Sequence, residues 1–174
     1  MARRRKARIP KFRKFARIIK KHVKRVVEDE LEDFAWELHG ELVNGILMQT
    51  FASFRTIPLR ESYLKRKIAK GLDPRVMIRT GHYMESITVF RHTDFEYEVN
   101  VPKDAVAVDE NRDPTEFSLR ALGEVQEFGS AKANVPARPH WRVIIRRAKR
   151  KAPKVAERIA DKAARRIRRD FRRA

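Results

Sequence analysis

Cysteine is absent from this chain of 174 residues. Disulfides, thiolate metal sites and catalysis by a thiol are therefore excluded. Long hydrophobic runs are absent too, since no uninterrupted apolar stretch approaches the roughly 18–20 residues that a membrane span needs. The basic N-terminus is followed by more lysine and arginine instead of an apolar segment, so we expect no secretory signal. The hydrophobic content of 42% is nevertheless sufficient for a folded core.

The residue types that usually carry catalysis are present, but without the spacing that catalysis needs. None of the five histidines has a second histidine four residues away, which is the helical pattern of a zinc site. The six glycines are scattered and form no phosphate-binding loop, and Ser86 and Ser130 lack the surroundings of a hydrolase nucleophile. No zinc-finger, homeodomain or RNA-recognition signature is present. We therefore expect no enzyme activity, no metal and no cofactor.

Charge is plentiful and unevenly distributed. The chain has a formal net charge of +19, yet residues 28–137 alone have a net charge of −7. The surplus lies at the two ends: residues 1–27 contain 13 basic and no acidic side chains, and residues 138–174 have a net charge of +13. Segments this basic favour phosphate groups or acidic protein surfaces as partners.

Both basic ends also carry apolar side chains at steps of mostly three or four, which predicts long amphipathic helices. We expect the first helix to run from Pro10 to about Ser53, and the last to start near Pro139 and to kink or restart at Pro153. Basic amphipathic helices can bind membranes, but in this composition the stripes favour burial against protein, so we expect no membrane partner. The N-terminal stripe consists of Phe12, Phe15, Ile19, Val23, Val26, Leu31, Phe34, Leu38 and Leu42, and the C-terminal stripe of Trp141, Ile144, Ala148, Ala152, Val155, Ile159, Ala163, Ile167 and Phe171.

Short elements of both kinds are predicted between these helices. A helix is expected over residues 61–70, and antiparallel strands over 86–92 and 95–102, with Thr93 and Asp94 in the turn. Residues 116–127 predict another helix, with Thr115 as its N-cap, followed by an extended connector over 130–139. We therefore expect one domain over residues 1–174, made of an N-terminal basic helix (1–57), a central α+β body (58–137) and a C-terminal basic helix (138–174).

Two segments carry a more specific pattern. Residues 63–87, YLKRKIAKGLDPRVMIRTGHYMESI, contain I-R-T-G-x-Y-x-x-S-I, and residues 119–142, LRALGEVQEFGSAKANVPARPHWR, contain E-F-G-S followed by P-A-R-P-H-W-R. In this order and spacing they resemble the tail-completion and virion-morphogenesis proteins of tailed bacteriophages, and most closely the minor tail protein Z group. The chain departs from that group at Tyr83, where an aliphatic residue is usual, and in its very basic residues 1–27.

The matching residues also make physical sense. Gly81 permits a turn with positive φ, Ser86 begins a strand with Ile87 pointing into the core, and Phe128 anchors a helix that Gly129 stops. The motif residues are Thr80, Gly81, Ser86, Ile87, Glu127, Phe128, Gly129, Pro136, Ala137, Arg138 and Pro139.

A second set of residues is a candidate interface between subunits. Arginine, tryptophan and apolar stripes favour such contacts. For Arg138, His140 and Trp141 a role in the fold and a contact between subunits both stay open. The candidate interface residues are Phe12, Phe15, Ile19, Val23, Arg138, His140 and Trp141.

The resemblance implies an α+β fold in which a small antiparallel sheet is packed by helices. It also implies a virion structural protein of the head–tail connector, which completes the tail as a hexameric ring between the head-completion proteins and the tail tube or its terminator. Phage DNA would pass through the ring without being read, and assembly would take place in the host bacterial cytoplasm. Two other interpretations stay open: another neck or tail component, such as a terminator or head-closure protein, and a non-specific basic nucleic-acid-binding protein.

Overall fold

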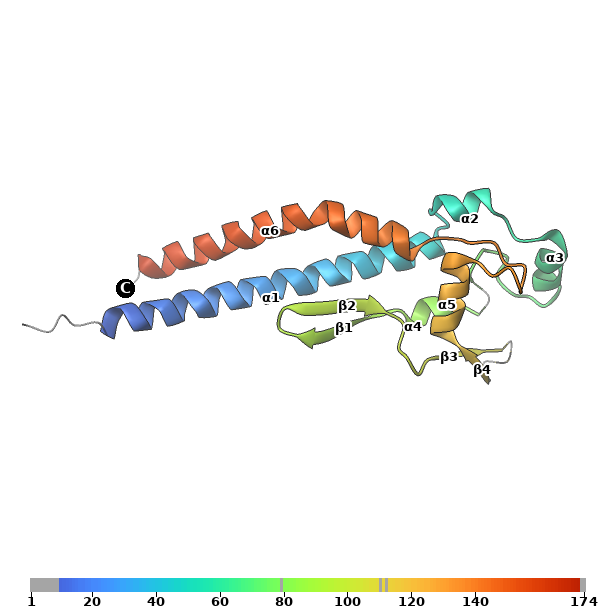
Figure 1. The fold of residues 1–174 in the computed structure, drawn as a ribbon, viewed down its shortest axis with the longest axis horizontal. Coiled ribbons are helices and arrows are strands. Elements are labelled where there is room, and N and C mark those ends of the chain that lie inside the picture. Colours follow the sequence, from blue (N-terminus) through green and yellow to red (C-terminus); the bar gives the residue numbers. More distant parts are fainter. Residues whose placement is uncertain (1–9, 79, 110, 112, 173–174) are drawn as a thin grey trace, which may run out of the picture.

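The computed structural model describes residues 10–78, 80–109, 111 and 113–172. Two long helices, α1 (Pro10–Leu47) and α6 (Trp141–Phe171), lie antiparallel side by side and give the molecule an elongated shape (Figure 1). The shorter elements gather toward the end where α1 stops and α6 begins (Figure 1).

Among the described residues between α1 and α6, three short helices come first, four strands follow, and one further helix comes before α6. In chain order they are α2 (Ala52–Thr56), α3 (Glu61–Ala69), α4 (His82–Ser86), β1 (Thr88–Thr93), β2 (Glu96–Asn100), β3 (Val106–Val108), β4 (Pro114–Ser118) and α5 (Leu119–Phe128). β1 pairs with β2 and β3 with β4, each pair forming a separate two-stranded antiparallel sheet. The β1–β2 hairpin packs against α1. The predicted α+β fold with long terminal helices is confirmed, with two small sheets in place of one.

The apolar stripes of the two terminal helices pack against each other. Val26 and Leu42 of α1 and Ile144, Val155 and Ala163 of α6 are buried. An amphipathic helix needs a partner for its apolar side, and here each terminal helix supplies the partner of the other within one chain.

A larger core lies at the end of this helical hairpin. It joins the C-terminal part of α1 and the first turn of α6 to the short elements. Its buried members are Leu42, Ile46, Phe51, Phe54, Val76, Ile78, Tyr83, Ile87, Val101, Leu119 and Ile144.

The first helix stops at Leu47, so the prediction that it would continue to about Ser53 is wrong. Gln49 has a φ of +53°, and the chain turns so that the ring of Phe51 lies over Gly45. A Cβ atom at Gly45 would be only 2.4 Å from that ring. The apolar spacing continues past the end of the helix because two more residues are buried: Phe51, which lies in the turn before α2, and Phe54, which lies on α2.

The helix predicted over 116–127 begins later than expected. Residues 114–118 form β4, and the hydroxyl of Thr115 donates to the carbonyl of Ala107 on β3 at 2.8 Å instead of capping a helix. α5 begins at Leu119, where the hydroxyl of Ser118 accepts the capping hydrogen bond. At the other end of the chain, α6 continues through Pro153 as one helix with a bend along its length (Figure 1).

Candidate functional site

The two motif segments meet in one buried cluster. The hydroxyl of Tyr83 lies 3.0 Å from Nε2 of His140, and the indole Nε1 of Trp141 donates to the same hydroxyl at 3.0 Å. Nδ1 of His140 lies 3.0 Å from the carbonyl oxygen of Arg138. Because a carbonyl only accepts, Nδ1 carries the hydrogen, and Nε2 therefore accepts the hydrogen of Tyr83. With this one tautomer of His140, the carbonyl of Arg138, both ring nitrogens and the hydroxyl of Tyr83 all have hydrogen-bond partners.

Glu127 joins the same cluster by capping α6. Its carboxylate is 3% exposed and accepts hydrogen bonds from the backbone N–H groups of His140 (2.7 Å), Trp141 (2.9 Å) and Arg142 (3.1 Å). Nε of Arg142 donates to it as well, at 2.7 Å. The first N–H groups of a helix have no partner within the helix, and the helix dipole favours an anion there. Glu127 therefore fixes where α6 starts and holds α5 against it.

The pKa values of these groups keep the cluster in one protonation state. Burial acts to raise the pKa of Glu127, but the N–H groups and Arg142 outweigh it, so this pKa lies below its ordinary value. Burial lowers the pKa of His140 and raises the pKa of Tyr83 to about 12. At neutral pH Glu127 is therefore charged, while His140 and Tyr83 are neutral.

Arg138 supports the fold of its own chain. Its guanidinium donates to the carbonyl oxygens of Ile57 and Pro58, each at 3.1 Å. Arg138 is 4% exposed and His140 is 0% exposed, whereas Trp141 is partly exposed. Of these three candidate interface residues, only Trp141 offers surface to a neighbouring subunit in this conformation, because Arg138 and His140 are enclosed by the core.

Two of the motif glycines occupy the conformations expected of them. Gly81 has a φ of +83° and Gly129 a φ of +79°, so the predicted glycine turn and glycine stop are confirmed. At Gly129 a Cβ atom would lie 2.8 Å from the backbone nitrogen of Ala137, which leaves no room for a side chain. Ile87 is buried, as expected.

Two other expectations for motif residues are wrong. Ser86 ends α4 instead of beginning a strand, and its hydroxyl donates to the carbonyl of Tyr83 at 2.8 Å. Phe128 is 68% exposed instead of anchoring its helix, because the buried side of α5 carries Leu119, Gly123 and Glu127.

Four of the motif residues lie around an open cleft. Thr80, Gly81, Pro136 and Arg138 line this cleft, which has a volume of about 810 Å³. Pro139 follows it, and its carbonyl accepts a hydrogen bond from the hydroxyl of Ser53 at 3.1 Å. The segment between α5 and α6 is thus tied to α2 as well as to α5.

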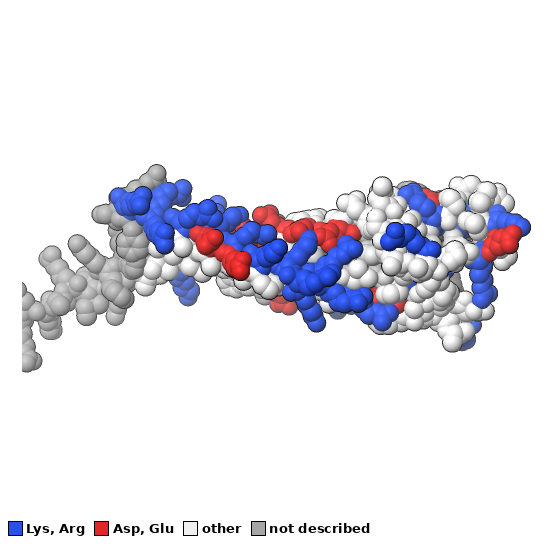
Figure 2. All heavy atoms as spheres, turned by 90° about the horizontal axis from the view of Figure 1, so that it is seen from above, with Lys and Arg blue, Asp and Glu red and all other residues white. Residues whose placement is uncertain are grey.

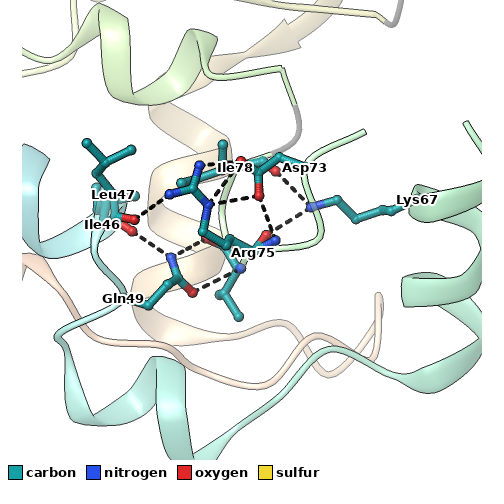
Figure 3. A network of polar contacts seen from close by, with 8 residues as sticks. Ile46, Leu47, Gln49, Lys67, Asp73, Arg75 and Ile78 are labelled. Carbon is teal, nitrogen blue, oxygen red and sulfur yellow. Dashed lines mark hydrogen bonds and ion pairs between the residues drawn. The ribbon is translucent and has the colours of Figure 1, made fainter. Parts of the chain in front are cut away.

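A polar network holds the loop that leads into the Thr80–Gly81 turn (Figure 3). The buried ammonium of Lys67 on α3 donates to the carbonyls of Arg75 (2.9 Å) and Ile78 (2.8 Å). The side-chain amide of Gln49 donates to the carbonyl of Val76 at 3.1 Å and accepts from its N–H at 3.0 Å. Side chains from α3 and from the turn after α1 therefore fix the backbone before the first motif.

A ladder of ion pairs connects α1 to α6. Carboxylates of α1 face cations of α6, except in the last pair, where His22 of α1 faces the carboxylate of Asp170 on α6. The order of the pairs runs in opposite directions along the two helices. The pairs are Glu41 with Arg147 and Lys151, Glu37 with Lys151, Glu30 with Arg158 and Lys162, Asp29 with Arg166, and His22 with Asp170. Within the ladder Glu30 is 2% exposed, and the hydrogen bond from Lys162, with that from Arg158, lowers its pKa despite burial.

The outward side of α6 carries a second set of cations, which we call the α6 cationic face. These side chains are exposed and form no ion pair with any residue that the structure describes. Figure 2 looks onto the side where α6 lies and shows lysine and arginine gathered along the helical hairpin. The members of the α6 cationic face are Arg146, Lys149, Arg150, Lys154, Arg165, Arg168, Arg169 and Arg172.

The N-terminal candidate interface residues lie toward the opposite end of α1. Val23 is exposed and Ile19 is partly buried, while the side chains of Phe12 and Phe15 lie outside the described residues. Within the described residues, the last ion pair between the two helices is that of His22 with Asp170, and α1 continues beyond it toward Pro10. The apolar stripe of α1 is therefore buried against α6 from Val26 onward.

Several residues of this arrangement, Tyr83 and Glu30 among them, were not predicted as site residues. Tyr83 entered only as a departure from the resembled group, and its pairing with His140 and Trp141 could have been suspected because each motif carries a polar aromatic residue. Glu30 was counted with the acidic central body. The acidic stretch over 28–41 lies on the same predicted helix as the basic start of the chain, and this was the available signal for the ladder.

Within the described ranges, no group of three or more histidine, aspartate or glutamate side chains could hold a metal ion. No helix among those residues is both long and apolar enough to cross a membrane. Comparison with protein-family models, with curated proteins and with solved structures gives no match for this chain.

Proposed function

We propose that this protein is a virion structural protein of the head–tail connector of a tailed bacteriophage. It forms a hexameric ring that joins the completed tail to the DNA-filled head, between the head-completion proteins and the tail terminator or tail tube. It is made and assembled in the host bacterial cytoplasm and has no enzymatic activity.

The observation that supports this proposal is the meeting of the two motif segments. The motif residues Thr80 and Gly81 of the first segment line one cleft with Pro136 and Arg138 of the second. Tyr83, at the position where the chain departs from the resembled group, adds a hydrogen bond to His140 of P-A-R-P-H-W-R. Residues that hold one another in a core are constrained together, so the motif pair behaves as one structural unit. The resemblance to tail-completion proteins therefore involves a coherent part of the fold.

The mechanism that we propose is recognition by surface burial as rings stack. The polar atoms of the buried cluster form hydrogen bonds with one another, and the cluster is a rigid base for the surrounding surface. Exposed apolar side chains of the kind that interfaces bury are available on several elements. They include Trp36, Met48, Phe95, Phe117 and Phe128.

The test is a clean deletion of the gene from the phage genome, with wild-type protein supplied in trans as the control. We expect filled heads and full-length tails that fail to join, and recovery of infectious particles on complementation. Normal infectivity of the deletion phage would reject the proposal, as would the absence of the protein from purified virions.

The same preparation separates the neighbouring interpretations. Loss of a tail terminator would give tails of irregular length, and loss of a head-closure protein would give heads that have lost their DNA. A basic nucleic-acid-binding protein with no part in the virion would not be found in purified particles.

A further inference from the structure

We propose that the α6 cationic face is a contact surface for the phosphate backbone of double-stranded DNA, without sequence readout. This inference deepens the proposed function, on which it rests for its biological setting, because it names the surface that meets DNA crossing the ring. The binding itself is a property of the isolated chain and can be measured without the virion.

The first argument is the division of charge around α6. The side of α6 toward α1 is matched by carboxylates, with Glu30, Glu37 and Glu41 each paired to lysine or arginine. The outward side has no such match within the described residues, so its positive potential is left for an external anion. Six of its eight members are arginine, which can bond phosphate oxygens in two prongs.

The second argument distinguishes DNA from an acidic protein. A protein interface needs an apolar core with large anchors, and the apolar side of α6 is already buried against α1 through residues such as Val155 and Ala163. Ile145 of α6 is 50% exposed, but it lines a groove with residues of α1 and of the β1–β2 hairpin. Between the cations the outward side presents small exposed residues, including Ala156, Ala160 and Ala164. Phosphate contacts require only donors and charge.

The third argument is the length of the face. Glu157 and Asp161 interrupt it and leave one group of cations over residues 146–154 and another over 165–172. With a rise of 1.5 Å per residue, the distance along the helix from Arg146 to Arg172 is about 39 Å. One turn of duplex DNA is about 34 Å, so a duplex lying along α6 can meet both groups.

The test uses the full-length protein and a fluorescent duplex of mixed sequence, about 30 base pairs long. Binding is followed by fluorescence anisotropy from about 50 to about 200 mM salt, where phosphate contacts lose affinity steeply. One variant carries Arg146→Gln, Lys149→Gln and Arg150→Gln on the α6 cationic face. The matched control carries Arg55→Gln, Lys103→Gln and Lys132→Gln, three exposed cations outside α6 that form no ion pair within the described chain. Both variants remove the same charge.

We expect the α6 variant to lose at least about tenfold in affinity and to reduce the slope of log affinity against log salt by about 2–3, since each phosphate contact contributes about 0.9. The control should keep the wild-type slope within about 1. Circular dichroism and thermal unfolding establish that both variants fold. Equal losses in the two variants, or no binding by the wild type at about 50 mM salt, would overturn the proposal.

An acidic polypeptide, polyglutamate, is the second ligand in the same assay. If polyglutamate binds the wild type as tightly as DNA does, and the α6 variant loses both equally, the face recognises acidic protein and the proposal is wrong. Failure of DNA binding would leave the joining defect of the deletion phage untouched. Normal infectivity of that phage would in turn leave the measured DNA binding intact, so the two proposals fail separately.

Discussion

Tyr83 donates its hydroxyl hydrogen to Nε2 of His140 across 3.0 Å, and this bond joins two segments that lie far apart in the sequence. The bond requires neutral His140, because a protonated imidazole has no acceptor nitrogen. Burial favours that neutral form by lowering the pKa of His140. The hydrogen bond between these two segments thus depends on the charge of one histidine.

The free energy of unfolding should therefore depend on pH through His140. Its pKa is near 6.5 in the unfolded chain and lower in the folded one, so below about pH 6.5 the unfolded chain takes up a proton that the folded chain does not. The stability that comes from keeping His140 neutral in the folded chain is fully present above about pH 6.5. It is lost as the pH falls from there toward the lower pKa of His140 in the folded chain. Urea unfolding between about pH 5 and 7.5 should show a steeper loss in the wild type than in His140→Gln. His82→Gln is the control, at a histidine that forms no ion pair within the described chain, and it should follow the wild type. Parallel curves for all three proteins would contradict the expectation.

Removal of the Glu127 carboxylate should destabilise the protein strongly. Glu127→Ala leaves the N–H groups of His140, Trp141 and Arg142 without their acceptor, and we expect a loss of about 2–4 kcal/mol in the free energy of unfolding. Glu124→Ala, on the exposed side of the same helix, should change it by less than about 0.5 kcal/mol. Chemical denaturation followed by circular dichroism measures both, and similar values for the two variants would argue against the capping role.

Within the ion-pair ladder, the buried carboxylate of Glu30 should contribute more to the free energy of unfolding than an exposed carboxylate on the same helix. Glu30→Gln leaves Arg158 and Lys162 without their partner, and we expect a loss of about 1–3 kcal/mol because both cations are half exposed and can turn to solvent. Asp33→Asn, an exposed change on the same helix, should cost less than about 0.5 kcal/mol. Thermal unfolding of the two variants checks this, and equal midpoints would refute it.

Replacement by alanine should change the free energy of unfolding in opposite directions at Gly45 and at Gly40. At Gly45 the new Cβ atom would collide with the ring of Phe51, so Gly45→Ala should destabilise the protein by about 1–3 kcal/mol. At Gly40, on the same helix, nothing lies within 4 Å of the new atom, and Gly40→Ala should stabilise it by about 0.5–1 kcal/mol. Urea unfolding decides the signs. Stabilisation by both substitutions would mean that Phe51 does not pack over Gly45.

The isolated protein should be monomeric or weakly associated in solution. A net charge of +19 on every copy opposes self-association at low salt, so the proposed ring should form mainly on its partners. Light scattering at moderate salt and low micromolar concentration is the measurement. A stable hexamer without partners would contradict this expectation.

Local spacing was enough to predict several parts of the molecule. The steps of three and four predicted both long helices because helix periodicity is a property of neighbouring residues. The glycine turn at Gly81 and the stop at Gly129 followed from the φ values that only glycine adopts readily. The hairpin over β1 and β2 followed from alternation of apolar and polar side chains in two adjacent segments.

The sequence by itself determined that the two ends are basic amphipathic helices, because charge and periodicity are local. It did not determine that each helix covers the other, or that α1 stops at Leu47, because an apolar stripe does not say what will bury it. Only the tertiary structure brought Tyr83 to His140 and placed Glu127 under the first turn of α6, since these contacts join residues 57 and 13 positions apart in the sequence. The packing of α1 against α6 also decided which cations of α6 are neutralised by α1 and which remain on the outward side of α6.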